Sequence, residues 1–266
     1  MTPGSTSNPF EGDRPAELWL VIPAYRESRR IGPFLRELLP LLESEPMRTR
    51  VVVVDDGSGE PELQRLRAVL APLLSGHPEL LRLLELPGNR GKGGAVRAGW
   101  DACPAGDFLG FVDADGSIAA REVARLARMA LGRRPNATSL FGSRVKMLGR
   151  KVERRGWRHV SGRAFATLVG LVTRVGVYDS QCGLKFVPAS VYHAIRPVLR
   201  EQGFAFDVEL MMAILRSGNA IEEVPIDWRE AAGGKVSFLK DPLKMLVALA
   251  AIQRRTSAWT FSKGES

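Results

Sequence analysis

Short apolar runs, each ending in a polar or glycine-rich turn, recur through the first half of this 266-residue chain. The runs are residues 18–22, 51–54 and 108–112, and residues 81–86 lead into a turn of the same kind. Unbroken apolar runs of this length, followed by segments of helical periodicity, are typical of buried parallel strands in βα units. The chain is also long enough to bury one large core. The sequence therefore predicts an α/β domain with a mostly parallel sheet flanked by helices.

The turns that follow these runs carry the candidate site. They comprise residues 23–28 (PAYRES), 55–58 (DDGS), 87–94 (PGNRGKGG) and 113–117 (DADGS). In an open parallel sheet, ligands bind beyond the carboxyl ends of the strands. We therefore expect the four turns to share one edge of the sheet.

Asp113 and Asp115 are two carboxylates placed one residue apart at the end of an apolar run. Hard cations such as Mg²⁺ and Mn²⁺ prefer oxygen ligands and often keep waters and substrate phosphates beside one or two protein carboxylates. A surface turn closed by Asp-Gly-Ser explains the same residues. The three other polar strand ends favour the metal site.

The segment Gly91-Lys92-Gly93-Gly94 precedes a predicted helix at residues 95–102. Glycines let backbone amides approach an anion, and a helix N-terminus favours negative charge. The segment lacks the Ser or Thr of a P-loop and the spacing of a dinucleotide-binding turn. It is therefore a candidate phosphate cradle of neither common type.

The formal net charge of +9 is compatible with binding nucleic acid, anionic lipid or phosphorylated substrates. Much of the excess lies between Arg133 and Arg174, where apolar residues from Trp157 to Val172 recur at helical spacing. A solvated helix face and a basic amphipathic helix at a membrane interface both fit this pattern.

A second amphipathic segment, residues 238–252, combines apolar residues with flanking lysines and arginines. Its apolar residues fit either docking on the body of the fold or contact with a membrane. We expect residues 1–16 to form a disordered leader, 17–238 the main domain and 239–266 an amphipathic helix and tail. No run reaches the length of a transmembrane helix, and two cysteines without metal or disulfide spacing indicate a reducing cytoplasm.

Taken in order, these segments resemble glycosyltransferase family 2, whose inverting members have the GT-A fold. The matching segments in the first half are VIPAYRES (21–28), VVVVDDGS (51–58), NRGKGGAVRAG (89–99) and FVDADGS (111–117). Those in the second half are FGSR (141–144), DSQCGLKFV (179–187), FAFDVEL (204–210) and EVPIDW (223–228). The second set is similar to the dolichyl-phosphate glucosyltransferase and bacterial polyprenyl-phosphate glycosyltransferase branch.

The resemblance implies a set of donor-binding residues. Asp55 would accept a hydrogen bond from the uracil ring, and the nucleotide would be bordered by Pro23, Ala24, Tyr25 and Glu27.

It also implies how the diphosphate is held. Lys92 would approach the diphosphate or organise its loop. Asp113 would contact the ribose or share the metal, and Asp115 would be the principal ligand of Mg²⁺ or Mn²⁺. Some relatives have a further ligand, often Gln, where this chain has Ser117, and waters can fill such a position.

The acceptor side follows from the chemistry of a polyprenyl phosphate. Its anionic oxygen attacks the anomeric carbon, so it needs cationic positioning more than deprotonation. The resemblance implies that the phosphate meets Arg144, Arg158, Arg163 and Lys185.

Three further residues of the second half have implied or open roles. We expect Asp179 to orient the attacking group or the sugar, with Gln181 beside it; a helix or turn cap is the other explanation for Asp179. Glu209 would face the acceptor or cap a helix. The predicted catalytic set is Asp115, Asp179, Arg144 and Gln181.

The resemblance implies a metal-dependent hexosyltransferase. It would move a hexose, glucose by the branch it resembles, from a UDP-sugar to undecaprenyl or dolichyl phosphate in one in-line displacement that yields a β-linked product. The enzyme would be peripheral on the cytoplasmic face of a membrane. The sequence predicts no oligomeric state.

Three other functions remain open from the residues alone. The same core could glycosylate a soluble saccharide or another lipid. A nucleotidyltransferase would have the same type of sheet and the same use of a divalent metal, and it would bind a nucleoside triphosphate. A basic nucleic-acid-binding protein would bind in a salt-dependent way, but it gives the acidic and glycine-rich strand ends no role, so we expect no nucleic-acid partner.

Overall fold

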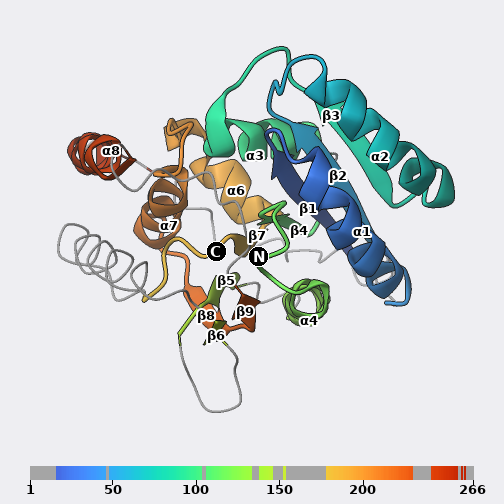
Figure 1. The fold of residues 1–266 in the computed structure, drawn as a ribbon. Helices are drawn as coiled ribbons and strands as arrows, with labels where there is room; N and C mark the ends of the chain where they lie inside the picture. Colours follow the sequence, from blue (N-terminus) through green and yellow to red (C-terminus); the bar gives the residue numbers. More distant parts are fainter. Residues whose placement is uncertain are drawn as a thin grey trace, which may run out of the picture.

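The computed structural model describes residues 16–45, 48–103, 106–133, 138–145, 152–153, 178–229 and 241–256, together with Trp259 and Phe261. Within these residues a seven-stranded sheet has the order β3-β2-β1-β4-β7-β5-β8, and helices cover both of its faces (Figure 1). All neighbouring strands are parallel except β7, which is antiparallel to both β4 and β5. The predicted α/β class with a mostly parallel sheet is confirmed.

Strands and helices alternate in the first half of the chain. The elements are β1 (Glu17–Ala24), α1 (Ser28–Glu43), β2 (Arg48–Asp55), α2 (Glu62–Gly76), β3 (Leu81–Glu85), α3 (Gly91–Asp101), β4 (Phe108–Val112) and α4 (Ala120–Leu131). The later elements are β5 (Ser139–Ser143), β6 (Val152–Glu153), β7 (Leu184–Pro188), α6 (Ala189–Ile195), the 3-10 helix η1 (Arg196–Val198), α7 (Phe206–Arg216), β8 (Ile221–Pro225), β9 (Trp228–Arg229) and α8 (Asp241–Thr256). Strands β6 and β9 form a separate two-stranded sheet.

The three apolar runs and residues 81–86 form the four parallel strands β1 to β4. Strand β4 has the predicted bounds, whereas β1 and β2 are longer because their ends pair in register from Glu17 with Arg48 to Ala24 with Asp55. Helix α3 begins at Gly91 rather than at residue 95. The glycine-rich segment is therefore the first turn of a helix.

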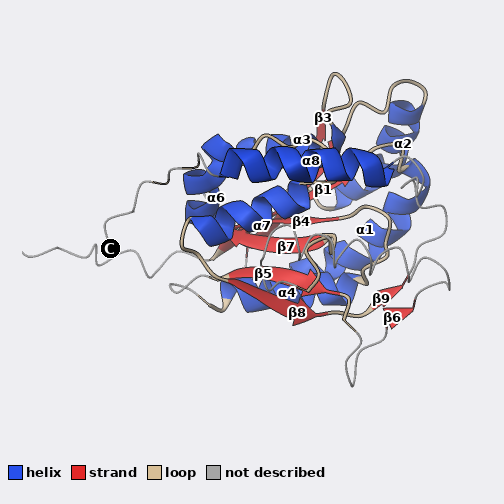
Figure 2. Cartoon of the chain, turned by 90° about the vertical axis from the view of Figure 1, so that its left-hand side faces the viewer, coloured by secondary structure: helices blue, strands red, loops and turns tan. Residues whose placement is uncertain are grey.

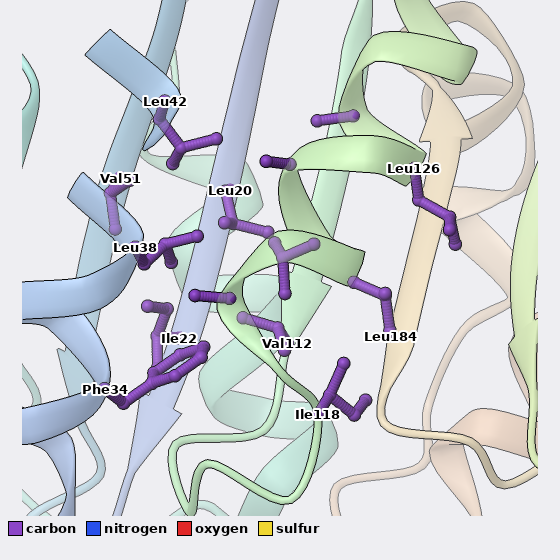
Figure 3. Packing of buried hydrophobic residues seen from close by; sticks show 14 of the residues in the cluster. Leu20, Ile22, Phe34, Leu38, Leu42, Val51, Val112, Ile118, Leu126 and Leu184 are labelled. Carbon is purple, nitrogen blue, oxygen red and sulfur yellow. The ribbon is translucent and has the colours of Figure 1, made fainter. Parts of the chain in front are cut away.

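Side chains point alternately to the two faces of the sheet along each strand, so the buried residues form one core on each face. Leu20 and Ile22 of β1 point to one face and pack with residues of α1 and α4 (Figure 3). Residues of α2 belong to the same core cluster. Val21, between them, points to the other face, where the core is completed by α3, α6 and α7. Figure 2 shows these two helical layers on either side of the sheet. A strand buried on both faces reads as a continuous apolar run, which is why the sequence shows these strands so clearly.

The reversed strand β7 brings a later part of the chain to the site. It lies between β4 and β5, with Lys185 opposite Phe111 and also opposite Phe141. Because β7 runs the other way, its first residue lies at the edge where its neighbours end. Residues 178–183 are consequently delivered to the edge that carries the ends of β1, β2, β4 and β5.

Helix α8 packs on the body of the protein. Leu249 and Ile252 are buried in the core cluster that includes α7, whereas Val247 is exposed. At its end, Arg255 donates to Glu201 Oε1 at 2.7 Å and to Glu209 Oε1 at 2.9 Å. Docking on the fold is thus confirmed for these apolar residues of the predicted segment 238–252.

Other expectations fall partly outside the described residues. Most of the predicted basic helix between Arg133 and Arg174 lies there, as do residues 1–15 of the predicted leader. Ala16, the last residue of that leader, packs against the core. Among the helices that the structure describes, none combines the length and the apolar character needed to cross a bilayer.

Candidate active site

Backbone hydrogen bonds tie the polar turns into one edge of the sheet. Asp56 N donates to Ala24 O at 2.8 Å, and Leu86 N donates to Asp55 O at 2.9 Å. The turns after β1, β2 and β3 are thereby joined. Asp113 N, just past β4, donates to Gly183 O at 2.9 Å. The predicted gathering of four strand ends is present, and the turn before β7 is added to it.

A chain of four charged side chains runs inward from this edge. Lys92 Nζ lies 3.0 Å from Asp113 Oδ1 and 3.0 Å from Asp207 Oδ2. Lys185 Nζ lies 2.6 Å from Asp207 Oδ1 and 2.6 Å from Cys182 O. The side chain of Asp113 is 40% exposed, that of Lys92 9%, and that of Lys185 not at all. The chain of alternating charges therefore leads from the open edge into the core.

Asp113 lies at the open end of this row of charges, where neighbouring carboxylates act on it. Partial burial and the carboxylates of Asp207 and Asp115 raise the pKa of Asp113 by more than Lys92 lowers it. Neighbouring like charges disfavour the ionised form. Asp115 is half-buried, and its Oδ1 accepts from Ser117 N at 2.9 Å. A cation bound between the carboxylates of Asp113 and Asp115 would relieve the repulsion that Asp115 exerts on Asp113.

These residues fit a divalent cation in their donor chemistry. Asp113 and Asp115 supply hard oxygen donors at an open edge, as Mg²⁺ and Mn²⁺ require. Among the described residues there is no cluster of three or more His, Cys, Asp or Glu side chains with metal-binding geometry. A cation here would thus complete its shell with substrate phosphate oxygens and water, which is usual for Mg²⁺.

Asp56 holds the start of helix α3. Its Oδ1 accepts from Arg90 N at 2.7 Å, and its Oδ2 accepts from Gly91 N at 2.8 Å. Gly94 N donates to Gln202 O at 3.1 Å. Burial raises the pKa of Asp56 more than these backbone donors lower it. The predicted phosphate cradle is therefore partly filled by the protein's own carboxylate, and Lys92 is the group of this turn that points to the site.

Asp55 is buried at the end of β2. Its Oδ2 accepts from Ser58 N at 3.0 Å, and Ser58 Oγ accepts from Arg26 N at 2.8 Å. Within the described part of the chain, no donor reaches the buried atom Asp55 Oδ1. A buried carboxylate oxygen without a donor is energetically unfavourable. It is the acceptor to which a ligand N–H can be matched.

Arg144 and Asp179 bind each other. Arg144 Nε and Nη2 donate to Asp179 Oδ2 and Oδ1 at 2.8 and 2.7 Å, and Arg144 N donates to Oδ2 at 2.8 Å. Glu223 Oε1 accepts from Asp179 N at 2.8 Å. Burial acts to raise the pKa of Asp179, but the attraction and hydrogen bonds of Arg144 outweigh it and hold that pKa below its usual value. The guanidinium also lies 5.6 Å from the ring centre of Trp228.

The remaining predicted donor residues border the same edge. Pro23 and Ala24 end β1, and the half-buried Tyr25 follows them. Glu27 binds Arg30 through two hydrogen bonds, Nε to Oε2 at 2.7 Å and Nη2 to Oε1 at 2.6 Å. The carboxylate of Glu27 thus helps to fix the first turn of α1.

The residues predicted for the acceptor side differ in where the structure places them. Gln181 is half-buried in the turn before β7, two residues from Asp179. Lys185 was predicted to contact the acceptor phosphate, but its ammonium is fully buried and lies 2.6 Å from both Asp207 Oδ1 and Cys182 O. Arg158 and Arg163 lie outside the described residues.

Two acidic residues were misjudged or missed. Glu209 was predicted to face the acceptor or to cap a helix. It is instead fully buried, and its Oε2 accepts from Arg200 N at 2.8 Å and from Glu201 N at 2.7 Å. Asp207 was not predicted, although it stands in the FAFDVEL segment. The signal for it was Lys185, a lysine within the apolar strand 184–188, because a fully buried lysine requires a counter-charge.

Comparison with known sequences identifies the class of protein. Residues 19–170 match the sequence profile described as "Glycosyl transferase family 2". The chain belongs to this family. Within it, the chain is similar to dolichyl-phosphate beta-glucosyltransferases: 32% identical to that of Saccharomyces cerevisiae over 92% of this chain and 77% of the yeast protein. The Homo sapiens protein is 30% identical, with 91% of this chain and 77% of the human protein covered.

Solved structures show the same fold. Glucosyl-3-phosphoglycerate synthase from Mycobacterium tuberculosis, in complex with Mn²⁺, UDP-glucose and phosphoglyceric acid, superposes with a TM-score of 0.66 at 18% identity, covering 91% of this chain and 80% of that chain. Mannosyl-3-phosphoglycerate synthase from Rubrobacter xylanophilus superposes with a TM-score of 0.67 at 17% identity, covering 91% and 75%. The predicted GT-A fold is confirmed.

Proposed function

We propose that this protein transfers glucose from UDP-glucose to a polyprenyl phosphate, with inversion to a β-linked lipid-phosphate sugar. The observation that carries the proposal is the single edge that joins Asp113, Asp115 and Lys92 to the Arg144–Asp179 pair. A family 2 chain about 30% identical to dolichyl-phosphate beta-glucosyltransferases over most of its length supports the same substrates.

The donor would be bound by its base and its diphosphate. Asp55 Oδ1, which no described donor reaches, would accept the N3–H of uracil. Pro23, Ala24, Tyr25 and Glu27 would line the nucleotide. The Lys92 ammonium would donate to a diphosphate oxygen, since it stands beside Asp113 at the open edge.

Asp113 and Asp115 would hold Mg²⁺ or Mn²⁺ against the diphosphate. When bound, the cation supplies positive charge to the departing nucleoside diphosphate. Lys92 would add a fixed positive charge on the same leaving group, which is stabilisation of the transition state by preorganised electrostatics.

Arg144 would position the acceptor phosphate. Its guanidinium is 26% exposed and already bound bidentately by the carboxylate of Asp179, and a phosphate presents a similar arrangement of oxygens. Exchange of one partner for the other would leave Asp179 to orient the attacking oxygen or the sugar, with Gln181 beside it. Arg158 and Arg163 would supply further cationic contacts. Lys185 would act through Asp207 and not by touching the phosphate.

The setting we propose is the cytoplasmic face of a membrane, with peripheral attachment. A polyprenyl chain keeps its phosphate at the bilayer surface, so the open edge must reach that surface. The net charge of +9 supports attraction to anionic lipid.

The test incubates the purified protein with Mg²⁺ or Mn²⁺, a panel of UDP- and GDP-sugars, and undecaprenyl or dolichyl phosphate. Both nucleotide release and lipid-linked sugar are followed. We expect a metal-dependent glycolipid from UDP-glucose. Nucleotide release only with a soluble saccharide would replace the acceptor, and turnover of a nucleoside triphosphate instead of a nucleotide sugar would overturn the proposal.

A further inference from the structure

We propose that Asp207 is a positioning residue that holds Lys92 in place for the donor diphosphate, with Lys185 as the buried counter-charge that fixes Asp207. The inference rests on the proposed function, because it assigns Asp207 a part in donor binding. It concerns a buried residue that reaches the open edge only through Lys92.

The carboxylate of Asp207 divides its two oxygens between two lysines. Oδ1 lies 2.6 Å from Lys185 Nζ, and Oδ2 lies 3.0 Å from Lys92 Nζ. The side chain of Asp207 is 3% exposed. Burial acts to raise the pKa of Asp207, but the two lysines outweigh it and hold that pKa below its usual value. Asp207 is therefore a buried anion with one cation on each side.

Lys185 has a fixed place in this arrangement. It belongs to β7 in the interior of the sheet, is fully buried, and donates also to Cys182 O at 2.6 Å. Its ammonium lies 5.3 Å from the ring centre of Phe111 and 4.9 Å from that of Phe141. A cation so enclosed has no route to a substrate. Its charge serves to anchor Asp207.

Lys92 is the outer of the two lysines that contact Asp207, and its side chain is 9% exposed. Its ammonium touches Asp113 as well as Asp207, and an ammonium has three donors. If the carboxylate of Asp113 binds a cation, Lys92 loses Asp113 as one of its two partners. The bond to Asp207 then keeps the ammonium at the edge, with two donors available for diphosphate oxygens.

The backbone of α3 and α7 allows Lys92 and Asp207 to come into contact. A Cβ on Gly93 would lie 2.4 Å from Phe206 Cβ and 2.8 Å from Glu201 O. Only glycine lets the first turn of α3 approach the first turn of α7 so closely. Lys92 and Asp207 are the residues next to these two, so the close approach brings their side chains into contact.

The first experiment is a double-mutant cycle on UDP affinity, measured by titration calorimetry with Mn²⁺ present. We expect Lys92→Met and Asp207→Asn each to weaken UDP binding by about 10-fold or more, the range of one charge-assisted hydrogen bond. Because Asp207 acts through Lys92, the combined variant should bind no more weakly than Lys92→Met alone. Additive losses would overturn the inference. Asp207→Glu, which keeps the charge, should bind more tightly than Asp207→Asn.

A second variant separates positioning from stability. Asp207→Asn leaves Lys185 without its counter-charge and lowers the melting temperature. Replacing both, Asp207→Leu with Lys185→Met, removes the buried pair and can recover stability, since apolar substitution of a buried ion pair is often neutral. We expect this variant to melt closer to the wild type than Asp207→Asn and still to bind UDP about 10-fold more weakly than the wild type.

A control variant and two contradicting outcomes complete the test. Asp101→Asn removes another paired carboxylate, which binds Arg196 and Tyr192 away from the site, and it should leave UDP affinity unchanged. Wild-type affinity in the Asp207→Leu/Lys185→Met variant would overturn the inference alone. Absence of UDP binding by the wild-type protein would overturn the proposed function, and the inference with it.

Discussion

Gly183 leaves the space that the carboxylate of Asp113 occupies. A Cβ on Gly183 would lie 1.9 Å from Asp113 Oδ2, and the backbone of the two residues is already joined by the bond from Asp113 N to Gly183 O at 2.9 Å. The turn before β7 therefore sets the position of an acidic residue at the end of β4. No other residue type can stand at position 183 without moving Asp113.

Gly183→Ala should accordingly impair catalysis by displacing Asp113. Misplacement of a reacting group by about 1 Å can lower rates by about 10²-fold, and we expect a loss of that order in kcat/KM for the donor. Steady-state kinetics at saturating metal measure it. Gly76→Ala is the matched control, because a Cβ there meets nothing within 4 Å; equal activity of the two variants would contradict the prediction.

Asp115→Ala should abolish turnover while leaving the fold intact. The side chain is half-buried, and its hydrogen bond to Ser117 N closes only a local turn. We expect a melting temperature close to that of the wild type and no glycolipid product at any Mg²⁺ or Mn²⁺ concentration. In the wild-type protein, a chelator should stop the reaction and added metal should restore it. Near-wild-type transfer by the variant would remove Asp115 from the metal site.

Asp55→Asn should weaken UDP binding through the uracil ring. A hydrogen bond to a charged group contributes about 1.5–3 kcal/mol, so we expect the dissociation constant to rise by about 10-fold or more. UDP methylated at N3 lacks the same hydrogen bond and should bind the wild type with a similar loss. The variant should not discriminate between the two ligands; continued discrimination would place the uracil elsewhere.

Asp179→Asn should remove part of the pH dependence of stability. The pKa of Asp179 is lowered in the folded protein, so its stabilising effect is complete above the unfolded value of about 3.9 and is lost as the pH falls through the folded value. We expect the variant to be destabilised by about 3 kcal/mol at pH 7 and the difference from the wild type to shrink toward pH 3. Urea unfolding across this range measures it.

The control for this prediction is Asp227→Asn. Asp227 pairs with the largely exposed Arg121 at 2.9 Å, and such surface pairs contribute about 1 kcal/mol or less. A difference between wild type and Asp179→Asn that stays constant from pH 7 to pH 3 would show that the carboxylate is not the source of the stability.

Membrane attachment predicts binding to anionic vesicles. We expect the protein to float with vesicles rich in anionic lipid at low salt, to remain largely unbound with neutral vesicles, and to detach as salt rises, because electrostatic attraction is screened. Failure to float at low salt would leave the net charge of +9 without a lipid role.

The first half of the fold was readable because β1, β2 and β4 are buried on both faces. Residues 51–54 and 108–112 are apolar without alternation, which only a covered sheet requires. The start of α3 was not readable in the same way: Gly91, Gly93 and Gly94 are poor helix formers, and what places them in a helix is contact with Asp56, Gln202 and Phe206. Tertiary contacts decided against local preference.

The part of the site that lies at the strand ends could be predicted from the sequence. Asp55, Asp113 and Asp115 lie at the expected edge because strand direction alone puts them there. Lys185 was misplaced because nothing local reveals that β7 is reversed and enclosed between β4 and β5. Asp207 was missed for the same reason: its meaning depends on Lys92 and Lys185, which are 115 and 22 residues away in sequence.

The reversal of β7 has a further consequence for where the proposed donor and acceptor residues lie along the chain. β5 ends, and β7 begins, at the same edge of the sheet, and the two strands are neighbours within it. Both ends of the connection between Ser143 and Leu184 therefore lie at this edge, so the length of that connection places no demand on strand register. The proposed donor residues precede this connection, and Asp179 lies near its end. We expect that exchange of this connection would give the same donor half a different acceptor.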